Sequence, residues 1–470
     1  MEKISEAFRK QREHHPEIKR TTAEERIEKI RRLRDAMLEK APQLREAIYA
    51  DYRKSPAEID LTEIFPVVAE ANHAIRNLKK WMRSSRVSTP KTLLGTSSEI
   101  RYEPKGVVLV IGPWNYPFSL VINPLISAIA AGNCVAIKPS ELTANTSAFL
   151  KGFLEKLFDP REVAVFEGDA TVTTRLLAEP FDHIFFTGSP RVGKIVMEAA
   201  AKHLSSVTLE LGGKSPAILD SSADLRKAAD RLVVGKFINA GQTCVAPDYV
   251  YVPASLGQAF LGELKSSIAR HYGETEDARK KSPDLCRVIN GRNFERIKKL
   301  VDESVARGAR VVVGGVFDAA ERYIAPTVLS DVKLDTPIMS EEIFGPVLPV
   351  LAYDDLSQVY RHLRSQGAEK PLALYIFSEN ARTTEDILAN TTAGGTCVNQ
   401  AILHLANPNL PFGGTGYSGV GNYHGLFGFK AFSHERAVLR QGRFDAFKML
   451  NAPYTPKVVK MIERVTRFLA

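Results

Sequence analysis

The sequence predicts an α/β protein in which helices cover both faces of parallel sheets. The first supporting observation is a set of short, mostly apolar runs, including the valine-rich GVVLVIG at residues 106–112 and HIFFTG at residues 183–188, which are typical of strands buried on both faces. The second is that helix-like segments, such as residues 120–132, alternate with these runs. The third is that polar loops rich in glycine and proline follow the runs, at the strand ends where such sheets bind ligands. Residues 106–205 are therefore predicted to form a nucleotide-type α/β domain.

The chain before the first of these strands is predicted to be helical. Residues 20–50 begin with Thr22 and Glu25 at the spacing of a capping box. Apolar side chains follow at helical spacing, namely Ile27, Ile30, Leu33 and Met37. Helical character continues to residue 82, and residues 86–104 are then predicted to form two extended strands or an arm that leaves the body of the fold.

A second α/β pattern begins at residue 206 with SVTLELGGKSPAILD and continues to about residue 395, so we place a domain boundary near residue 209. Loop-rich sequence follows. The chain ends in PKVVKMIERVTRFLA, whose apolar residues share one helical face: Val458, Met461, Ile462, Val465 and Phe468. This basic amphipathic segment is predicted either to lie on a membrane surface or to pack against this or a partner subunit, and we favour packing.

Composition limits the class of protein. Of the 470 residues, 44% are apolar and 25% are charged, which is typical of globular chains with one very large domain or two to three ordinary ones. The four cysteines are irregularly spaced, so we expect free thiols in a reducing, cytoplasmic compartment. The net charge of +9 is spread among many acids, and no HExxH or Cys/His cluster occurs, so we predict neither a nucleic-acid partner nor a bound metal. We also find no signal peptide and no apolar run near the roughly 20 residues that span a bilayer.

Cys244 is the most unusual cysteine because it lies in a polar loop, NAGQTCVAPD, at residues 239–248. A predicted helix leads into this loop and a predicted strand leaves it, so the thiol lies on a connection, where active residues concentrate. Two interpretations are open, an inert loop thiol and a nucleophile. The other three cysteines, Cys134, Cys286 and Cys397, have ordinary or apolar neighbours.

Two polar residues at predicted strand ends are candidate partners for this thiol. Glu210 interrupts an apolar strand and precedes two glycines, which suits a general base with room to move; the alternative is a surface glutamate on an edge strand. Asn115 lies beyond a buried strand, and its amide could donate to an oxyanion; the alternative is a turn-forming asparagine beside glycine and proline.

Two further strand-end loops are candidates for nucleotide binding. The loop FTGSPRVGK at residues 186–194 follows a strand and opens a helix, which is the position of a phosphate-binding turn, although it lacks the GxGxxG pattern. The loop IKPSE at residues 137–141 places Lys138 and Glu141 at another strand end, near the expected ribose or phosphate.

Together these segments resemble those of the aldehyde dehydrogenase superfamily. Seven motifs occur in that family's order across residues 113–414: PWNYP, KPSE, FTGS, LELGGK, GQTC, EEIFGP and LPFGG. The residues GQTCVAPDYV and the C-terminal segment are similar to sequences of the class 3 branch, which acts on fatty and aromatic aldehydes. The resemblance implies an aldehyde dehydrogenase-like α/β fold with a Rossmann-type cofactor domain, a second α/β catalytic domain and a β bridging arm. It also implies NAD or NADP as cofactor, a small-molecule aldehyde as substrate and a homodimer.

The resemblance also implies a role for each matched position. Cys244 would be the nucleophile, Glu210 the general base, and Asn115 an oxyanion donor together with the backbone N–H of Cys244. The implied cofactor-binding residues are Lys138 and Glu141 at the adenosine ribose, Gly188 and Ser189 under the pyrophosphate, and Glu342 at the nicotinamide ribose with Phe344 nearby. The implied domains are 1–85 and 104–208 for the dinucleotide, 209–395 for catalysis, 86–103 and 431–440 for the arm, and 441–470 for the tail.

These residue types suit oxidation of an aldehyde to an acid. A thiolate that adds to the carbonyl makes a thiohemiacetal, and loss of hydride leaves a thioester that an activated water can hydrolyse. Only hydrolysis needs a base such as Glu210, so we favour a free acid over the alternative, a coenzyme A-acylating enzyme of the same fold. The other alternative is a non-catalytic binding or structural relative, against which the presence of Cys244, Glu210 and Asn115 argues.

Overall fold

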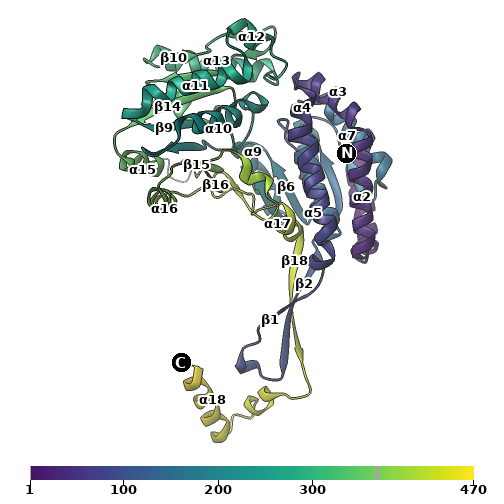
Figure 1. Ribbon diagram of the computed structural model, residues 1–470. Helices are drawn as coiled ribbons and strands as arrows, with labels where there is room; N and C mark the ends of the chain where they lie inside the picture. Colours follow the sequence, from purple (N-terminus) through teal and green to yellow (C-terminus); the bar gives the residue numbers. More distant parts are fainter. Residues whose placement is uncertain (1, 366–369, 470) are drawn as a thin grey trace.

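The computed structural model describes residues 2–365 and 370–469, which form two α/β lobes and an arm that projects from them (Figure 1). One sheet has six strands in the order β17-β7-β6-β3-β4-β5, and the other has seven in the order β10-β13-β14-β9-β8-β15-β16. Neighbouring strands are parallel except at β10 and β17, which are antiparallel edge strands. The predicted α/β class with parallel sheets is confirmed.

The six-stranded sheet forms the nucleotide-type lobe. Its strands are β3 (Val107–Ile111), β4 (Cys134–Lys138), β5 (Val163–Val165), β6 (His183–Thr187), β7 (Ser206–Glu210) and β17 (Gly419–Val420). Its helices include α6 (Ser119–Ala131), α7 (Ala144–Leu157), α8 (Ala170–Leu176) and α9 (Pro190–Ala201). From β3 the chain continues to β4 and β5 on one side and then returns to β6 and β7 on the other. Ligands of such sheets bind beyond the strand ends at this reversal, which here lies between β3 and β6.

Both faces of this sheet are buried, which explains its valine-rich strands. In β3, Val108 and Val110 pack in one apolar cluster, which includes side chains of α6 and α7. The alternate residues Val107, Leu109 and Ile111 pack in another cluster, which includes side chains of α8 and α9. Successive side chains of a strand point to opposite faces, so one strand contributes to two cores.

The seven-stranded sheet forms the second lobe. Its strands are β8 (Pro216–Leu219), β9 (Tyr249–Pro253), β10 (Arg310–Val313), β13 (Thr327–Ser330), β14 (Val347–Tyr353), β15 (Ala373–Phe377) and β16 (Gly395–Val398). Its helices include α10 (Leu225–Phe237), α11 (Gly257–Tyr272), α13 (Gly291–Ala306), α14 (Pro337–Ser340), α15 (Leu356–Ser365) and α16 (Ala381–Asn390). The sequence assigned residues 206–210 to this second pattern, but they form β7 of the first sheet, and β7 continues two residues beyond the boundary expected after residue 208. The GG pair that follows Glu210 is where the chain leaves the first sheet.

The N-terminal segment is helical, as predicted, and packs on the first lobe (Figure 1). It comprises α1 (Glu2–Lys19), α2 (Ala23–Glu39), α3 (Ala41–Tyr52), α4 (Pro56–Ile59), one π-helical turn η1 (Asp60–Ile64) and α5 (Phe65–Trp81). The capping box is confirmed, because the Thr22 side chain accepts from the Glu25 backbone and the Glu25 side chain accepts from the Thr22 backbone. Helix α1 was not predicted; its Gln11 side chain donates to the carbonyl of Val135 at 3.0 Å and docks the helix against β4.

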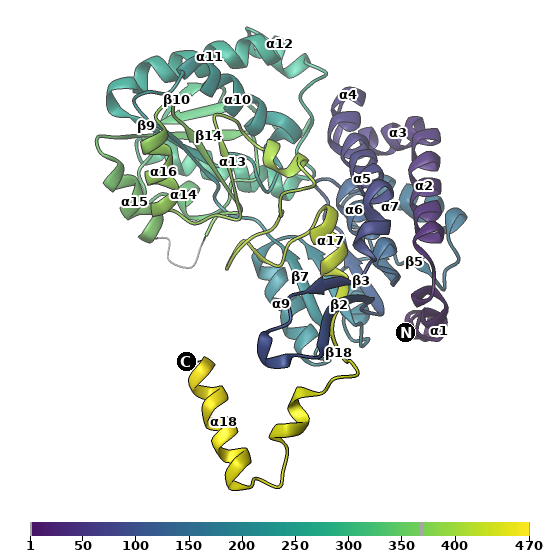
Figure 2. The same ribbon diagram turned by 60° about the horizontal axis from the view of Figure 1, so that its bottom comes forward.

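The arm is a three-stranded antiparallel sheet of β1 (Ser85–Val87), β2 (Thr96–Pro104) and β18 (Ser433–Gln441). It extends away from both lobes and leads into α18 (Pro456–Leu469), which stands apart from the rest of the chain (Figure 2). No α18 side chain that the structure describes is buried, and the side chain of Phe468 lies outside that description. Within its own chain α18 contacts η6 (Ala446–Leu450), so packing against this or a partner subunit and lying on a membrane surface both stay predictions. In the described ranges, no helix is both long and apolar enough to cross a bilayer.

The Thr22 cap gives a test of the N-terminal helices. We expect Thr22→Ala to lower the free energy of unfolding by about 1 kcal/mol, because the backbone N–H groups at the start of α2 lose their acceptor. Urea denaturation followed by circular dichroism measures this change. Thr22→Ser keeps the hydroxyl and is the matched control; equal losses in both variants would contradict the assigned cap.

Candidate active site

Five of the residues singled out in the sequence lie along one edge of the first sheet. Glu210 ends β7 and Lys138 ends β4, while Asn115 follows β3 and Gly188 and Ser189 follow β6. They share this edge because parallel strands all end on the same side of a sheet. The second lobe faces the edge with two further segments, the loop that carries Cys244 and the loop that carries Glu342.

Cys244 lies at the end of residues 238–244, which we call the thiol loop. After α10 the chain turns at residues 238–241, and within this turn Asn239, Ala240 and Gly241 have φ angles of 55°, 51° and 72°. Left-handed backbone costs a residue with a side chain roughly 1–2 kcal/mol. At Gly241 a Cβ would also lie 2.2 Å from the carbonyl oxygen of Gly345, so only glycine fits. The loop needs outside contacts to keep this conformation.

Gln242, two residues before the thiol, supplies many of those contacts from a fully buried position. Its Nε2 donates to the carbonyls of Asn239 at 3.0 Å and Arg287 at 3.1 Å. Its Oε1 accepts from the backbone N–H of Ile289 at 2.9 Å. The glutamine of the GQTC motif therefore fixes the loop to the segment around residue 288.

Asn115 joins the thiol loop to the first lobe. The Asn115 side-chain Nδ2 donates to the backbone carbonyl of Gln242 at 3.1 Å. The backbone carbonyl of Asn115 accepts from Asn239 Nδ2 at 2.9 Å. The next residue, Tyr116, shares a hydrogen bond of 2.6 Å with Thr243 Oγ1. The amide nitrogen carries two N–H groups, so Asn115 can hold the loop with one and offer the other to a ligand beside the thiol.

The Cys244 thiol is partly buried between two carboxyl groups. Its pKa is raised to about 12, chiefly by desolvation and then by the nearby Glu342 and Glu210 carboxylates. A thiol with such a pKa is neutral at pH 7. Reaction as a thiolate therefore requires a base, or an added positive charge near the sulfur.

Glu210 is a buried carboxyl group with no internal partner. The side chain is 3% exposed, and neither carboxyl oxygen has a hydrogen-bond partner among the described residues. Burial raises its pKa well above the usual value. Its backbone is fixed, because its carbonyl accepts from Gly188 N at 3.0 Å. Buried polar atoms usually have hydrogen-bond partners, so we expect this carboxyl group to form hydrogen bonds with water or a ligand.

Glu342 approaches from the second lobe, on the loop after α14. A Cβ at Gly212 would lie 2.1 Å from Glu342 Oε2, so the carboxyl rests directly against the glycine backbone. Burial, and then the charge of Asp248, raise the pKa of Glu342 to about 8. The Phe344 ring, two residues on, meets the Trp114 ring edge-on at 5.3 Å.

The Glu342 loop is held by charged side chains that the sequence did not single out. Lys214 pairs with Asp248 and donates to the carbonyl of Ile338 at 2.8 Å. Arg296 donates to the carbonyl of Ile343 at 2.7 Å. Lys214 ends the LELGGK motif, so its motif position was the available sequence signal. Arg296 has no such signal, because it lies on the polar face of an ordinary amphipathic helix.

A cavity of about 370 Å³ opens next to Glu342, between the two lobes. Its lining includes Pro190, Gly212, Lys214, Glu342 and Tyr417. Neither Cys244 nor Glu210 lines it, so it adjoins the thiol site rather than containing it.

The remaining candidates lie farther along the sheet edge. Lys138 is 2% exposed, and its Nζ donates to the carbonyl of Pro139 at 2.7 Å and to the exposed Glu141 carboxylate at 3.1 Å. Ser189 caps α9, and Gly188 is packed on the Phe186 ring, which a Cβ would approach to 2.5 Å. Lys138 ends β4 and Gly188 follows β6, and these two strands flank β3, which suits an extended ligand that runs along the edge of the sheet.

These features fit a dinucleotide. The amino end of α9 carries the positive end of the helix dipole, which favours a pyrophosphate, and Gly188 and Gly212 keep the backbone open beside it. Lys138 and Glu141 at one end and Glu342 at the other could each meet a ribose. The unpaired Glu210 carboxyl lies at the end where Cys244 is. The site thus combines a nucleotide edge with a thiol, a buried carboxyl and an amide donor.

Comparison with known proteins gives one consistent family. Residues 1–438 match the sequence profile of the aldehyde dehydrogenase family. The chain is 42% identical over 468 residues to aldehyde dehydrogenase family 3 member B1 of Homo sapiens, covering 98% of this chain and 97% of that protein. It is 43% identical to the 4,4'-diaponeurosporen-aldehyde dehydrogenase of Staphylococcus aureus, with 88% of each chain covered. The solved structure of Staphylococcus aureus AldH in a substrate-bound state superposes with a TM-score of 0.93 at 39% identity, covering 98% and 99% of the two chains.

The surroundings of Cys244 predict how its reactivity depends on pH. We expect the rate of its alkylation by iodoacetamide to rise about tenfold per pH unit between about pH 7 and pH 10, because the neutral thiol predominates throughout. Peptide mass mapping assigns the modified cysteine. Glu342→Gln is the companion variant: above about pH 8, where Glu342 is ionised, loss of its charge lowers the pKa of the thiol and speeds alkylation. A rate that is flat between pH 7 and 9 would show an already ionised thiol.

Proposed function

The chain belongs to the aldehyde dehydrogenase family and is therefore an oxidoreductase, and from this premise we propose that it oxidises aliphatic or aromatic aldehydes to carboxylic acids with NAD or NADP. The observation that carries the proposal is the Glu210 carboxyl, buried and unpaired among the described residues, whose charge acts on the Cys244 thiol. A buried carboxyl without a partner adds nothing to packing. Its use is to accept a proton from a group that arrives with the substrate.

In the proposed reaction Cys244 is the nucleophile. One of the two carboxylates that act on the thiol, Glu210 or Glu342, takes the thiol proton and releases it to solvent, and the sulfur adds to the carbonyl carbon of the aldehyde. The resulting oxyanion accepts hydrogen bonds from Asn115 Nδ2 and from the backbone N–H of Cys244; each such donor is worth about 2.7–4 kcal/mol in comparable sites. Bound NAD(P)+ supplies the hydride acceptor. What remains on the sulfur is a thioester.

Glu210 then completes the turnover. Its carboxylate takes a proton from water as the oxygen attacks the thioester carbon, and the thiolate leaves with the electron pair of the C–S bond. The product is a carboxylic acid, and the enzyme regains its thiol. Because burial raises the pKa of Glu210, the carboxylate is a stronger base than an exposed glutamate, which suits proton removal from water. A coenzyme A-acylating enzyme would have no use for this group.

Two further proposals concern the class of substrate and the residues that bind the cofactor. The rings of Trp114 and Tyr116 flank Asn115, and they suit an apolar aldehyde chain or ring. One relative is named 4,4'-diaponeurosporen-aldehyde dehydrogenase, and this name supports the proposal of an apolar aldehyde as substrate. We propose Lys138, Glu141, Gly188, Ser189, Glu342 and Phe344 as the residues that hold the dinucleotide.

Two substitutions test the chemistry. We expect Cys244→Ala to abolish both aldehyde oxidation and ester hydrolysis, because no other nucleophile lies in the site. We expect Glu210→Gln to retain a burst of reduced cofactor but to slow steady-state turnover by about 10²- to 10⁴-fold, with acyl-enzyme accumulating.

The measurements are absorbance of the reduced cofactor with a panel of aldehydes and both cofactors, and intact-mass detection of the acyl-enzyme. Cys397→Ala, which removes a buried thiol of the second lobe, is the matched cysteine control. Full activity of the Cys244→Ala variant would contradict the proposed mechanism. Acceleration of turnover by coenzyme A would favour the acylating alternative.

We also propose that the arm and tail join two copies of the chain. Several large apolar side chains in β18 and in the segment that follows it are at least half exposed: Leu439 at 56%, Phe444 at 57%, Met449 at 56% and Tyr454 at 66%. Apolar surface of this extent usually lies in a contact between proteins. None of the side chains of α18 that the structure describes is buried within its own chain.

Truncation tests this proposal. We expect the full chain to sediment as a homodimer and a protein of residues 1–441 to dissociate at higher concentrations, because the exposed apolar side chains beyond β18 are removed. Sedimentation velocity over a concentration series measures the change. Identical dimerisation of the two proteins would exclude a role for the tail, and stronger flotation of the full chain with liposomes would assign the tail to a membrane surface.

A further inference from the structure

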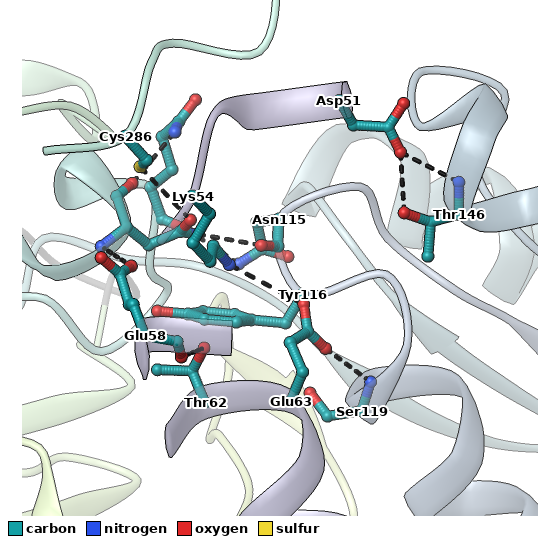
Figure 3. A network of polar contacts seen from close by, with 12 residues as sticks. Asp51, Lys54, Glu58, Thr62, Glu63, Asn115, Tyr116, Ser119, Thr146 and Cys286 are labelled. Carbon is teal, nitrogen blue, oxygen red and sulfur yellow. Dashed lines mark hydrogen bonds and ion pairs between the residues drawn. The ribbon is translucent and has the colours of Figure 1, made fainter. Parts of the chain in front are cut away.

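A group of charged side chains from the N-terminal segment reaches the thiol loop without belonging to the reacting groups. Lys54 and Glu58 lie between α3 and η1, almost 200 residues before Cys244 in the sequence. Figure 3 shows them beside Tyr116, Asn115 and the loop. None of the proposed chemistry uses either residue.

Glu58 contacts the point where the thiol loop turns left-handed. Its Oε1 accepts from the backbone N–H of Asn239 at 2.7 Å, and Asn239 is the first of the three residues with positive φ. The carboxyl is directed to this N–H by the start of α4, because the backbone N–H of Glu58 donates to the Ser55 side chain at 3.3 Å. One end of the loop is therefore fixed by a side chain from another part of the chain.

Lys54 contributes at the other end of the loop. Its ammonium is fully buried, lies 3.8 Å from Glu63 and 4.6 Å from the centroid of the Tyr116 ring. Tyr116 in turn bonds to Thr243, the residue before the thiol. The Glu63 carboxylate accepts from the backbone N–H of Ser119 at 2.7 Å, so the ammonium is placed against the start of α6.

The segment that carries both residues is itself anchored. Asp51, at the end of α3, accepts from the backbone N–H of Thr146 at 3.0 Å and from its hydroxyl at 2.7 Å (Figure 3). The charges that face Glu58 are Lys54, Asp284 and Glu63; burial raises the pKa of Glu58 and the Lys54 ammonium opposes that rise. An ionised carboxylate makes a stronger hydrogen bond to an N–H than a neutral group does.

Stability alone is a weak reason for this arrangement. Buried charges pay a large desolvation cost, and well-packed apolar side chains in their place are often equally stable. What apolar side chains cannot do is accept the N–H of Asn239, which the left-handed turn directs away from the rest of the loop.

We propose that Glu58 is a positioning residue for Cys244. By accepting the backbone N–H of Asn239, its carboxylate holds the left-handed turn that aims the thiol, while Lys54 keeps Tyr116 in place at the other end of the loop. The inference rests on the proposed role of Cys244 as nucleophile. It predicts a loss in chemistry without a loss in cofactor binding.

The test compares Glu58→Ala, which removes the acceptor, with Glu58→Gln, which keeps an oxygen at the same position. In the full chain we expect Glu58→Ala to lower kcat for aldehyde oxidation by about 10- to 100-fold, as small misplacements of reacting groups do. KM for the cofactor should change less than about twofold. Glu58→Gln should recover most of kcat. Glu46→Ala, an exposed glutamate of α3, is the control.

A second readout separates this inference from the proposed function. Hydrolysis of 4-nitrophenyl acetate requires a reactive Cys244 but neither aldehyde nor cofactor, and it should fall in Glu58→Ala and recover in Glu58→Gln. If the wild-type chain oxidises no aldehyde but the ester results hold, the proposed function fails and the positioning role stands. If Glu58→Ala only lowers the melting temperature, with kcat and ester hydrolysis per folded molecule unchanged, Glu58 is structural and the inference is overturned.

Discussion

The hydrogen bonds among Asn115, Asn239 and Gln242 are the constraint on which the candidate site depends. They join a strand-end loop of one lobe to the thiol loop of the other, and they do so at 2.9–3.1 Å within a buried space. Since Asn239 and its neighbour adopt a backbone conformation that side chains disfavour, the loop would relax without them. The position of the sulfur relative to the first sheet is therefore set by amides, and only indirectly by the packing of the two cores.

Burial of the carboxyl groups is the second determinant. Glu210 and Glu342 approach the same thiol from different lobes, and each raises the pKa of the sulfur. Their own pKa values are raised by desolvation, so all three groups hold their protons more tightly than they would in water. The neutral thiol therefore predominates at pH 7, which slows its oxidation and alkylation between turnovers.

Local patterns predicted most of the fold, and long-range contacts were what they missed. Short apolar runs identified β3, β4 and β6, and the Thr22–Glu25 spacing identified a helix start, because each depends on neighbours in sequence. The boundary placed after residue 208 cut off the last two residues of β7, because the sequence of an apolar strand does not show which sheet the strand joins. Cys244 and Glu210 stood out by their unusual neighbours, whereas Glu58 lies in an ordinary helical context and meets Asn239 only through the fold, 181 residues away.

The pairing of β2 with β18 has a consequence for biosynthesis. These strands are separated by more than three hundred residues, and β17, which closes the edge of β7, is also made near the end of translation. The edge of β7 stays unpaired until residue 420 has been synthesised and the edge of β2 until residue 441, so both are open to other polypeptides while most of the chain already exists. A prematurely terminated chain therefore exposes two unpaired strand edges, and chaperones and proteases can recognise it by these edges, which the finished molecule does not expose.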